Sequence, residues 1–155
     1  MGFSLLGLAV ALAVLLPNLL LVWFPPTEPW PDAAVPRILT ALERVGQALC
    51  VVVPAVTLPG ILVWAWLILA IAALAGYDAL WVRYLSRGRS LRLLYGPFWR
   101  VPVPMAILPV VTFLAAAAWL SNPWFAVAAV VLAIGHIPAS VIIARALTTD
   151  SAARR

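Results

Sequence analysis

The chain has 155 residues, of which 66% are hydrophobic and only 10% are charged. Because soluble domains are roughly half apolar, a soluble fold of this length could not bury so much apolar surface, and the composition predicts one integral membrane domain. The net charge of +5 comes from ten arginines without a lysine. In a membrane protein such an excess indicates orientation and contact with membrane lipids, and nothing favours a nucleic acid partner.

Five segments are apolar enough to cross a membrane as helices, a crossing that needs about 20 residues. In chain order, we expect helices at about residues 3–24, 36–57, 61–85, 101–120 and 124–147. They are separated by a proline-rich linker (25–37), a Pro-Gly turn (59–60), a basic loop (86–100) and a Ser-Asn-Pro turn (121–123). The first segment has no basic flank and no small-residue cleavage site, so we interpret it as a retained helix. The predicted fold is an all-α, polytopic transmembrane bundle in a single domain, residues 1–155.

Charge is distributed unevenly over the two sides of this predicted bundle. With five helices, the first linker, the basic loop and the C-terminus share one side, and the arginines gather there. The other side, made of the N-terminus and the two short turns, carries no charged side chain. The positive-inside rule then predicts that the N-terminus lies outside and the C-terminus in the cytoplasm.

Polar side chains from four different helices are predicted to lie at a similar depth. At 1.5 Å per helical residue, each is about 10–13 Å from the cytoplasmic boundary: Asn18, Glu43, Asp78 and His136. Charged groups at such depth cost a few kcal/mol unless they are paired or hydrated, so we expect them to face one interior cavity. Gln47, one helical turn after Glu43, is expected to point into the same cavity.

Structural explanations compete with this interpretation. They are a snorkelling Arg44, an ion pair of Asp78 with Arg83 or Arg44, a His136 hydrogen bond to a carbonyl freed by Pro138, and a kink at Pro17 served by Asn18. Glu43 is the hardest of these residues to explain by structure alone. The single cysteine, Cys50, is expected to be a small core residue.

An aromatic stripe follows Asp78 on the third predicted helix. Tyr77, Trp81 and Tyr84 have the i, i+4, i+7 spacing that aligns side chains along one helix face. Such a stripe either packs against lipid and neighbouring helices or lines a cavity in which aromatic faces stabilise a cation. The sequence has no metal-ligand spacing, P-loop or nucleophile elbow, so we predict no metal and no cofactor.

Four short motifs carry a resemblance to known proteins. LERVGQ (42–47), WVRY (81–84), PVPMAILP (102–109) and IGH (134–136) resemble signatures of small, five-helix bacterial membrane proteins, most of them without an assigned function. More weakly, the size, the helix number and a buried acid in an aromatic setting are similar to membrane-bound terpene cyclases. The first resemblance implies a multi-pass protein of the bacterial inner (cytoplasmic) membrane. The second implies metal-independent protonation of an alkene or epoxide of a prenyl chain by acidic residues.

The leading hypothesis is therefore an acid-initiated cyclase of an isoprenoid or prenylated hydrophobic substrate. A carboxylic acid that an apolar site keeps protonated can act as a general acid. We expect Glu43 to donate the proton, Asp78 to act as second acid or electrostatic partner, and His136 to take up the final proton. Expected substrate-binding residues are Asn18, Gln47, Tyr77, Trp81 and Tyr84.

Two other classes of function remain open on the sequence. A five-helix bundle with a polar layer could bind or transport a porphyrin, sterol, lipid or small solute, or it could be an accessory subunit. The tryptophan-rich sensory proteins have this size and helix number, but only a fragment of their patterns, GPFW (96–99), occurs here. The identity of the substrate and the oligomeric state are left open.

Overall fold

The computed structural model describes residues 2–153, and the side chains of residues 2–149. These residues form helices and no strand. Four helical stretches are long and apolar enough to cross a membrane: Leu5–Trp23, Arg37–Val56, Trp64–Ser86 and Pro123–Thr149. A fifth apolar helix, α6 (Pro104–Trp119), has only 16 residues. The described chain therefore has the character of a membrane protein.

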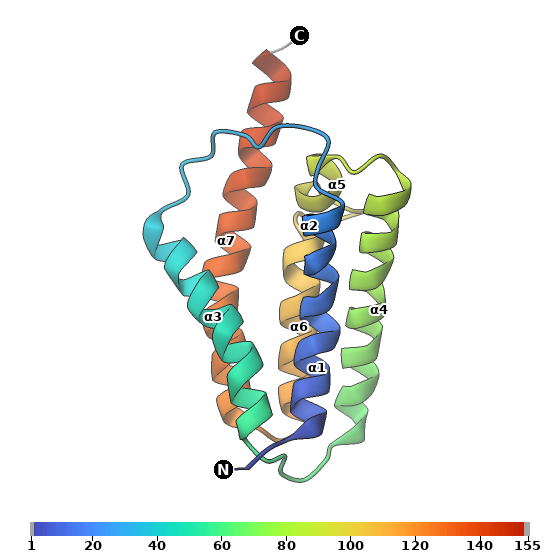
Figure 1. Cartoon of the computed structure of the whole chain (residues 1–155), viewed down its shortest axis with the longest axis vertical. Coiled ribbons are helices and arrows are strands. Elements are labelled where there is room, and N and C mark those ends of the chain that lie inside the picture. Colours follow the sequence, from blue (N-terminus) through green and yellow to red (C-terminus); the bar gives the residue numbers. More distant parts are fainter. Residues whose placement is uncertain (1, 154–155) are drawn as a thin grey trace.

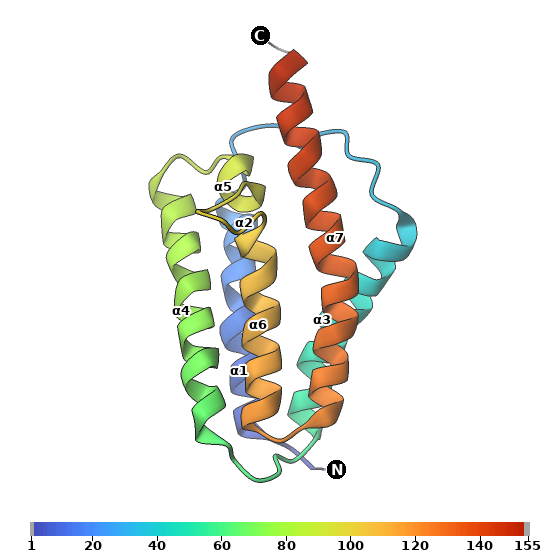
Figure 2. The same ribbon diagram turned by 180° about the vertical axis from the view of Figure 1, so that it is seen from behind.

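The helices run side by side in one bundle, and the two views agree on their order (Figures 1 and 2). α1 (Leu5–Leu15) and α6 lie in the middle. On one side of them α3 (Arg37–Val56) packs against α7 (Pro123–Ala153), and on the other side lies α4 (Trp64–Ser86), which packs against α6. The linker that precedes α3, the loop that follows α4 and the C-terminal part of α7 lie at one end of the bundle (Figure 1).

The first predicted helix is interrupted near its middle. After α1, residues Leu16–Leu19 form a 3-10 turn, η1, and the helix resumes as α2 (Leu20–Trp23). Pro17 lies in the turn, and its missing N–H and bulky ring disfavour a regular α-helix at that point. At the other end, the Ser4 hydroxyl caps α1 by accepting a hydrogen bond from the Gly7 N–H at 3.1 Å.

Two glycines bring α3 and α7 into close contact. A Cβ atom at Gly46 would collide with the backbone of Leu132, and one at Gly135 would collide with the backbone of Glu43. Small residues at helix interfaces allow such close approach, which favours helix association within membranes. The buried strip of α3 is narrow and consists of Gly46, Cys50 and Pro54. Glu43 is therefore held directly against α7.

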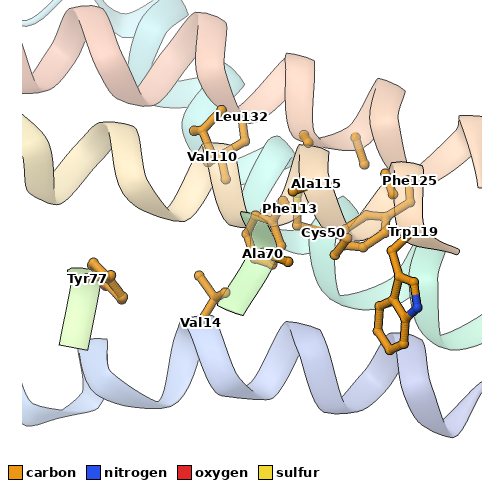
Figure 3. Close-up of a cluster of buried hydrophobic side chains, with 14 of the residues drawn as sticks. Val14, Cys50, Ala70, Tyr77, Val110, Phe113, Ala115, Trp119, Phe125 and Leu132 are labelled. Carbon is orange, nitrogen blue, oxygen red and sulfur yellow. The ribbon is translucent and has the colours of Figure 1, made fainter. Parts of the chain in front are cut away.

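The hydrophobic core surrounds α6 and contains residues from every long helix (Figure 3). Ten of the 16 residues of α6 are buried. The rings of Phe113 and Phe125 stack in a tilted arrangement with centroids 5.6 Å apart. Cys50 is fully buried in this cluster, as a small core residue, in agreement with the prediction.

Several helix boundaries differ from the predicted ones. α4 begins three residues later than predicted, because Gly60 and Val63 donate backbone hydrogen bonds to the carbonyls of Leu120 and Trp119. The basic loop 86–100 contains an unpredicted short helix, α5 (Leu91–Tyr95), whose Leu91 and Leu94 are buried. α6 begins at Pro104, three residues later than predicted, after a turn that is closed by backbone hydrogen bonds between Phe98 and Val101. α7 continues to Ala153, six residues beyond the predicted end.

Candidate functional site

A contact between the carboxyl group of Glu43 on α3 and the imidazole of His136 on α7 is the centre of the candidate site. Nδ1 of His136 lies 2.7 Å from Oε1 of Glu43, and the two side chains are 23% and 25% exposed. The glycine contact at Gly135 places the backbone of Glu43 beside the residue that precedes His136, so that the two side chains meet. His136 is thus held by Glu43, and not by a carbonyl freed at Pro138. Because Nδ1 is engaged, Nε2 is the ring nitrogen available to a ligand.

A small cavity of about 60 Å³ lies next to this pair. Polar, aromatic and aliphatic side chains line it, and they come from η1, α2, α4, α5, α6 and α7: Asn18, Leu21, Tyr77, Trp81, Leu94, Tyr95, Met105, Ala106, His136 and Ser140. Four of these, Asn18, Tyr77, Trp81 and His136, are residues that the sequence singled out. A cavity of this volume holds a few water-sized groups or the reacting end of a larger molecule.

Asn18 and Tyr77 form a second polar contact on the cavity wall. The Tyr77 hydroxyl donates a hydrogen bond to Oδ1 of Asn18 at 3.0 Å, which ties η1 to α4. The Asn18 amide donates in turn to the carbonyl of Val14 at 3.4 Å, within the turn that Pro17 introduces. Asn18 therefore serves the kink, as the structural explanation expected, and also orients the phenol of Tyr77.

The aromatic stripe of α4 is buried, and its members have different surroundings. Trp81 makes edge-to-face contacts with Tyr77 and Tyr84, with ring centroids 6.2 and 5.7 Å apart. The Tyr84 hydroxyl donates to the carbonyl of Phe24 at 2.9 Å, and Tyr84 does not line the cavity. Nε1 of Trp81 is buried without an acceptor at hydrogen-bonding distance. A buried donor without a partner is costly, and because Trp81 also lines the cavity, its N–H group is a candidate donor to a ligand there.

Asp78 and Gln47 do not join this site, which corrects the expected convergence of Glu43, Gln47, Asp78 and His136. Both side chains are exposed on the outer surface of the bundle. Asp78 follows Tyr77, whose side chain faces inward, and successive helical residues are rotated by about 100°. Gln47 is displaced in the same way from Gly46, which occupies the narrow buried strip of α3. Asp78 also forms no ion pair with Arg83 or Arg44 among the described side chains.

The other six residues that line the cavity were not selected by sequence reasoning, and Met105, Tyr95 and Ser140 are among them. Ser140 is buried and lies one turn after His136, so its i+4 spacing was a usable signal. Tyr95 belongs to α5, and its place became visible only with the fold. Burial, together with the negative charge of Glu43, raises the pKa of Tyr95 to about 12. Tyr95 therefore stays a neutral hydrogen-bonding group across the physiological range.

The arrangement is suited to moving a proton at Nε2 of His136. A carboxylate that contacts one ring nitrogen of a histidine orients the ring and stabilises its protonated form. Within the described residues, no group of three or more His, Cys, Asp or Glu side chains could hold a metal ion. No family model, curated protein or solved structure matches this chain. The geometry of its own residues is accordingly the basis of the functional assignment.

Proposed function

We propose that this protein is a membrane-embedded cyclase that isomerises a prenylated hydrophobic substrate by acid–base chemistry at His136. The observation that carries the proposal is the 2.7 Å contact of Glu43 with His136 beside a cavity that His136, but not Glu43, lines. In this arrangement His136 is the residue that exchanges a proton with the substrate. Glu43, expected from the sequence to be the donor, becomes the residue that orients His136.

The proposed reaction begins at the epoxide of a prenyl chain, because an epoxide oxygen accepts a proton from an imidazolium more readily than an isolated alkene does. His136 donates the Nε2 proton to the epoxide oxygen while the C–O bond breaks, and a tertiary carbocation forms. The π electrons of a neighbouring alkene attack this carbon, so that a C–C bond closes a ring. The final cation returns a proton to Nε2, and substrate and product are isomers.

The aromatic residues of the cavity have two roles in this scheme. The faces of Tyr77 and Trp81 stabilise the carbocation, an interaction of roughly 1–2 kcal/mol per ring. The unpartnered Nε1–H of Trp81 donates a hydrogen bond to the substrate oxygen. Asn18 lines the cavity and is also exposed, so the cavity reaches the surface of the bundle at η1, where a chain dissolved in the membrane can approach. Only the reacting end of the chain fits into about 60 Å³.

The proposal includes five membrane crossings, with the N-terminus outside and the C-terminus in the cytoplasm of a bacterium. A helix of 16 residues spans about 24 Å, less than the hydrocarbon core of about 30 Å. α6 is nevertheless surrounded by other helices, so its ends can be shielded by protein and not by lipid. The linker before α3, the loop after α4 and the C-terminal part of α7 lie toward the same end of the bundle (Figure 2), and the arginines that these segments carry support the cytoplasmic assignment of that end.

The test is turnover of terminal epoxides of farnesyl and geranylgeranyl compounds by the purified protein in lipid nanodiscs. His136→Gln should lower the rate by about 10²–10⁴-fold, the usual contribution of general acid catalysis. Glu43→Gln should lower the rate less than His136→Gln, because the amide can still contact the imidazole ring but no longer carries a charge. Asp78→Asn is the matched control, an exposed carboxylate on α4, and should keep the rate. Product yield and melting temperature are measured on the same samples.

Two results would contradict the proposal. A folded His136→Gln protein with full activity would remove the proton donor. An Asp78→Asn protein that loses as much activity as His136→Gln would move the chemistry to the outer face of α4.

A further inference from the structure

A larger cavity, of about 510 Å³, lies at the end of the bundle where the arginines gather. Three of its lining residues are arginines from three different helices: Arg83 in the last turn of α4, Arg92 in α5 and Arg145 in α7. Most of the remaining lining is apolar. The volume lies within the range of about 300–1,000 Å³ that is typical of ligand pockets.

None of the described side chains neutralises the positive charge of this cavity. Among the side chains that the structure describes, the Glu43–His136 contact is the only ion pair, so none of the three arginines has a carboxylate partner. Glu28 contacts α5, but its Oε2 accepts a hydrogen bond from the Leu91 N–H at 3.3 Å, and it does not line the cavity. Three unpaired cations around one hollow attract an anion.

Arg83 gives a second and independent indication of a ligand. Its Nε atom is buried and has no hydrogen-bond partner. Its guanidinium carbon lies 4.8 Å from the centroid of the Phe98 ring, which holds the planar group in place. A buried N–H of a charged group that lacks an acceptor is costly, and a ligand oxygen would supply the missing partner.

An apolar groove begins at the same arginine. This groove, of about 360 Å³, lies between α4 and α6. Apart from Arg83 its lining is apolar and includes Leu80, Phe98, Trp99 and Ile107. Arg83 is common to the lining of the groove and of the larger cavity. Arg83 thus lies between a cationic cavity and an apolar groove, which is the layout that an amphiphile requires. The Trp99 ring, 93% exposed, stands at the groove as an anchor for a chain.

We propose that this site binds a lipid with a phosphate monoester headgroup, with the phosphate between Arg83, Arg92 and Arg145 and one apolar chain in the α4–α6 groove. The planar, forked donors of arginine match phosphate oxygens in bidentate geometry. A phosphate monoester carries about −1.5 to −2 charges near neutral pH. Three arginines therefore select it over zwitterionic lipids and over lipids with a single negative charge. The site does not depend on the chemistry proposed for His136.

The experiment is native mass spectrometry of the full chain in detergent, titrated with dioleoyl phosphatidic acid. Dioleoyl phosphatidylglycerol tests the headgroup charge, and inorganic phosphate tests whether the chain is required. We expect one phosphatidic acid to bind saturably, phosphatidylglycerol to bind at least tenfold more weakly and inorganic phosphate not to bind at the same concentrations. Arg83→Gln and Arg145→Gln should each weaken phosphatidic acid by roughly tenfold, as loss of a charged hydrogen bond predicts.

Arg87→Gln is the matched control, because Arg87 is an exposed arginine at the same end of the bundle that lines neither hollow. Its binding should equal that of the unaltered protein. Equal weakening by Arg87→Gln and Arg145→Gln would overturn the proposal in favour of diffuse surface charge. Binding of inorganic phosphate as tight as that of phosphatidic acid would overturn the role of the groove. If Arg83→Gln fails to fold, Arg145→Gln, at an exposed position, decides between the outcomes. Retained binding in His136→Gln would show that the two sites are separate.

Discussion

The two helix pairs α3–α7 and α4–α6 pack by different means. α3 meets α7 backbone to backbone, because Gly46 and Gly135 carry no side chain at the contact. α4 meets α6 through side chains, as with the rings of Trp64 and Trp119, whose centroids are 6.0 Å apart. Close backbone packing brings the polar side chains of Glu43 and His136 into contact, whereas the side-chain packing of α4 on α6 is accompanied by an apolar groove that begins at Arg83. The ion pair accordingly belongs to the first pair, and the apolar groove to the second.

Adding one methyl group to each helix pair tests the difference in packing most directly. Gly135→Ala would place a Cβ against the backbone of Glu43, whereas Gly76→Ala would meet only the side chain of Leu108 at 3.5 Å. Overpacking of a tight contact costs about 1–3 kcal/mol or more, while replacing a helical glycine by alanine gains up to about 1 kcal/mol. We expect Gly135→Ala to lower the melting temperature strongly and Gly76→Ala to leave it unchanged or raised. Similar losses in both variants would mean that the two pairs pack alike.

A double-mutant cycle on Glu43→Gln and His136→Gln measures the coupling energy between these two side chains, which meet where α3 and α7 pack. The expected coupling energy is about 1–3 kcal/mol, because the side chains touch and are partly shielded from solvent. The same cycle on Asp78→Asn and Arg83→Gln tests the ion pair that the sequence allowed and the structure lacks, and it should give a coupling near zero. Unfolding in a denaturing detergent supplies the free energies. Coupling between Asp78 and Arg83 as large as that between Glu43 and His136 would contradict the orientation of α4.

The ionisation of Tyr95, which lies on α5 and is influenced by the charge of Glu43, allows a test of stability at alkaline pH. The pKa of Tyr95 is raised to about 12 in the folded protein, whereas in the unfolded chain it is about 10. Between these values the unfolded state releases the proton first, so the stability that neutral Tyr95 provides is present below pH 10 and is lost as pH rises toward 12. Because phenylalanine cannot ionise, Tyr95→Phe should make the loss of unfolding free energy at alkaline pH smaller by on the order of 1–2 kcal/mol. Melting curves of both proteins across this pH range provide the measurement, and identical curves would show that Tyr95 ionises freely.

The smallest expected effect concerns the hydroxyl of Tyr84, which lies in the aromatic stripe but outside the cavity. Tyr84→Phe removes the hydrogen bond to the carbonyl of Phe24, which should cost about 1 kcal/mol of stability. It should leave turnover at the proposed site unchanged. Tyr77→Phe removes a hydrogen bond of similar geometry to Asn18 but alters the cavity wall, and should reduce turnover at a similar cost in stability. A loss of turnover in Tyr84→Phe equal to that in Tyr77→Phe would mean that both tyrosines contribute to the proposed site.

The amino-acid sequence by itself determined the helical membrane character of the protein and the approximate limits of its long helices. Those properties follow from the number of apolar residues in a row and from proline and glycine at their ends, and both are local. Similar depth along the axis brought Asn18, Tyr77 and His136 to one cavity. Depth could not say which way a side chain points around its helix, and Asp78 and Gln47 were misassigned for this reason.

Only the tertiary structure decided that direction, because the buried face of a helix depends on which neighbour it meets and how closely. The glycine contact turned Glu43 toward His136, and the inward stripe of Tyr77 and Trp81 turned Asp78 outward. The same holds for α5, whose five residues are too few to form a stable helix alone. Burial of Leu91 and Leu94 against the bundle stabilises α5. This places Tyr95 at the small cavity beside His136 and Arg92 at the larger cavity with Arg83 and Arg145.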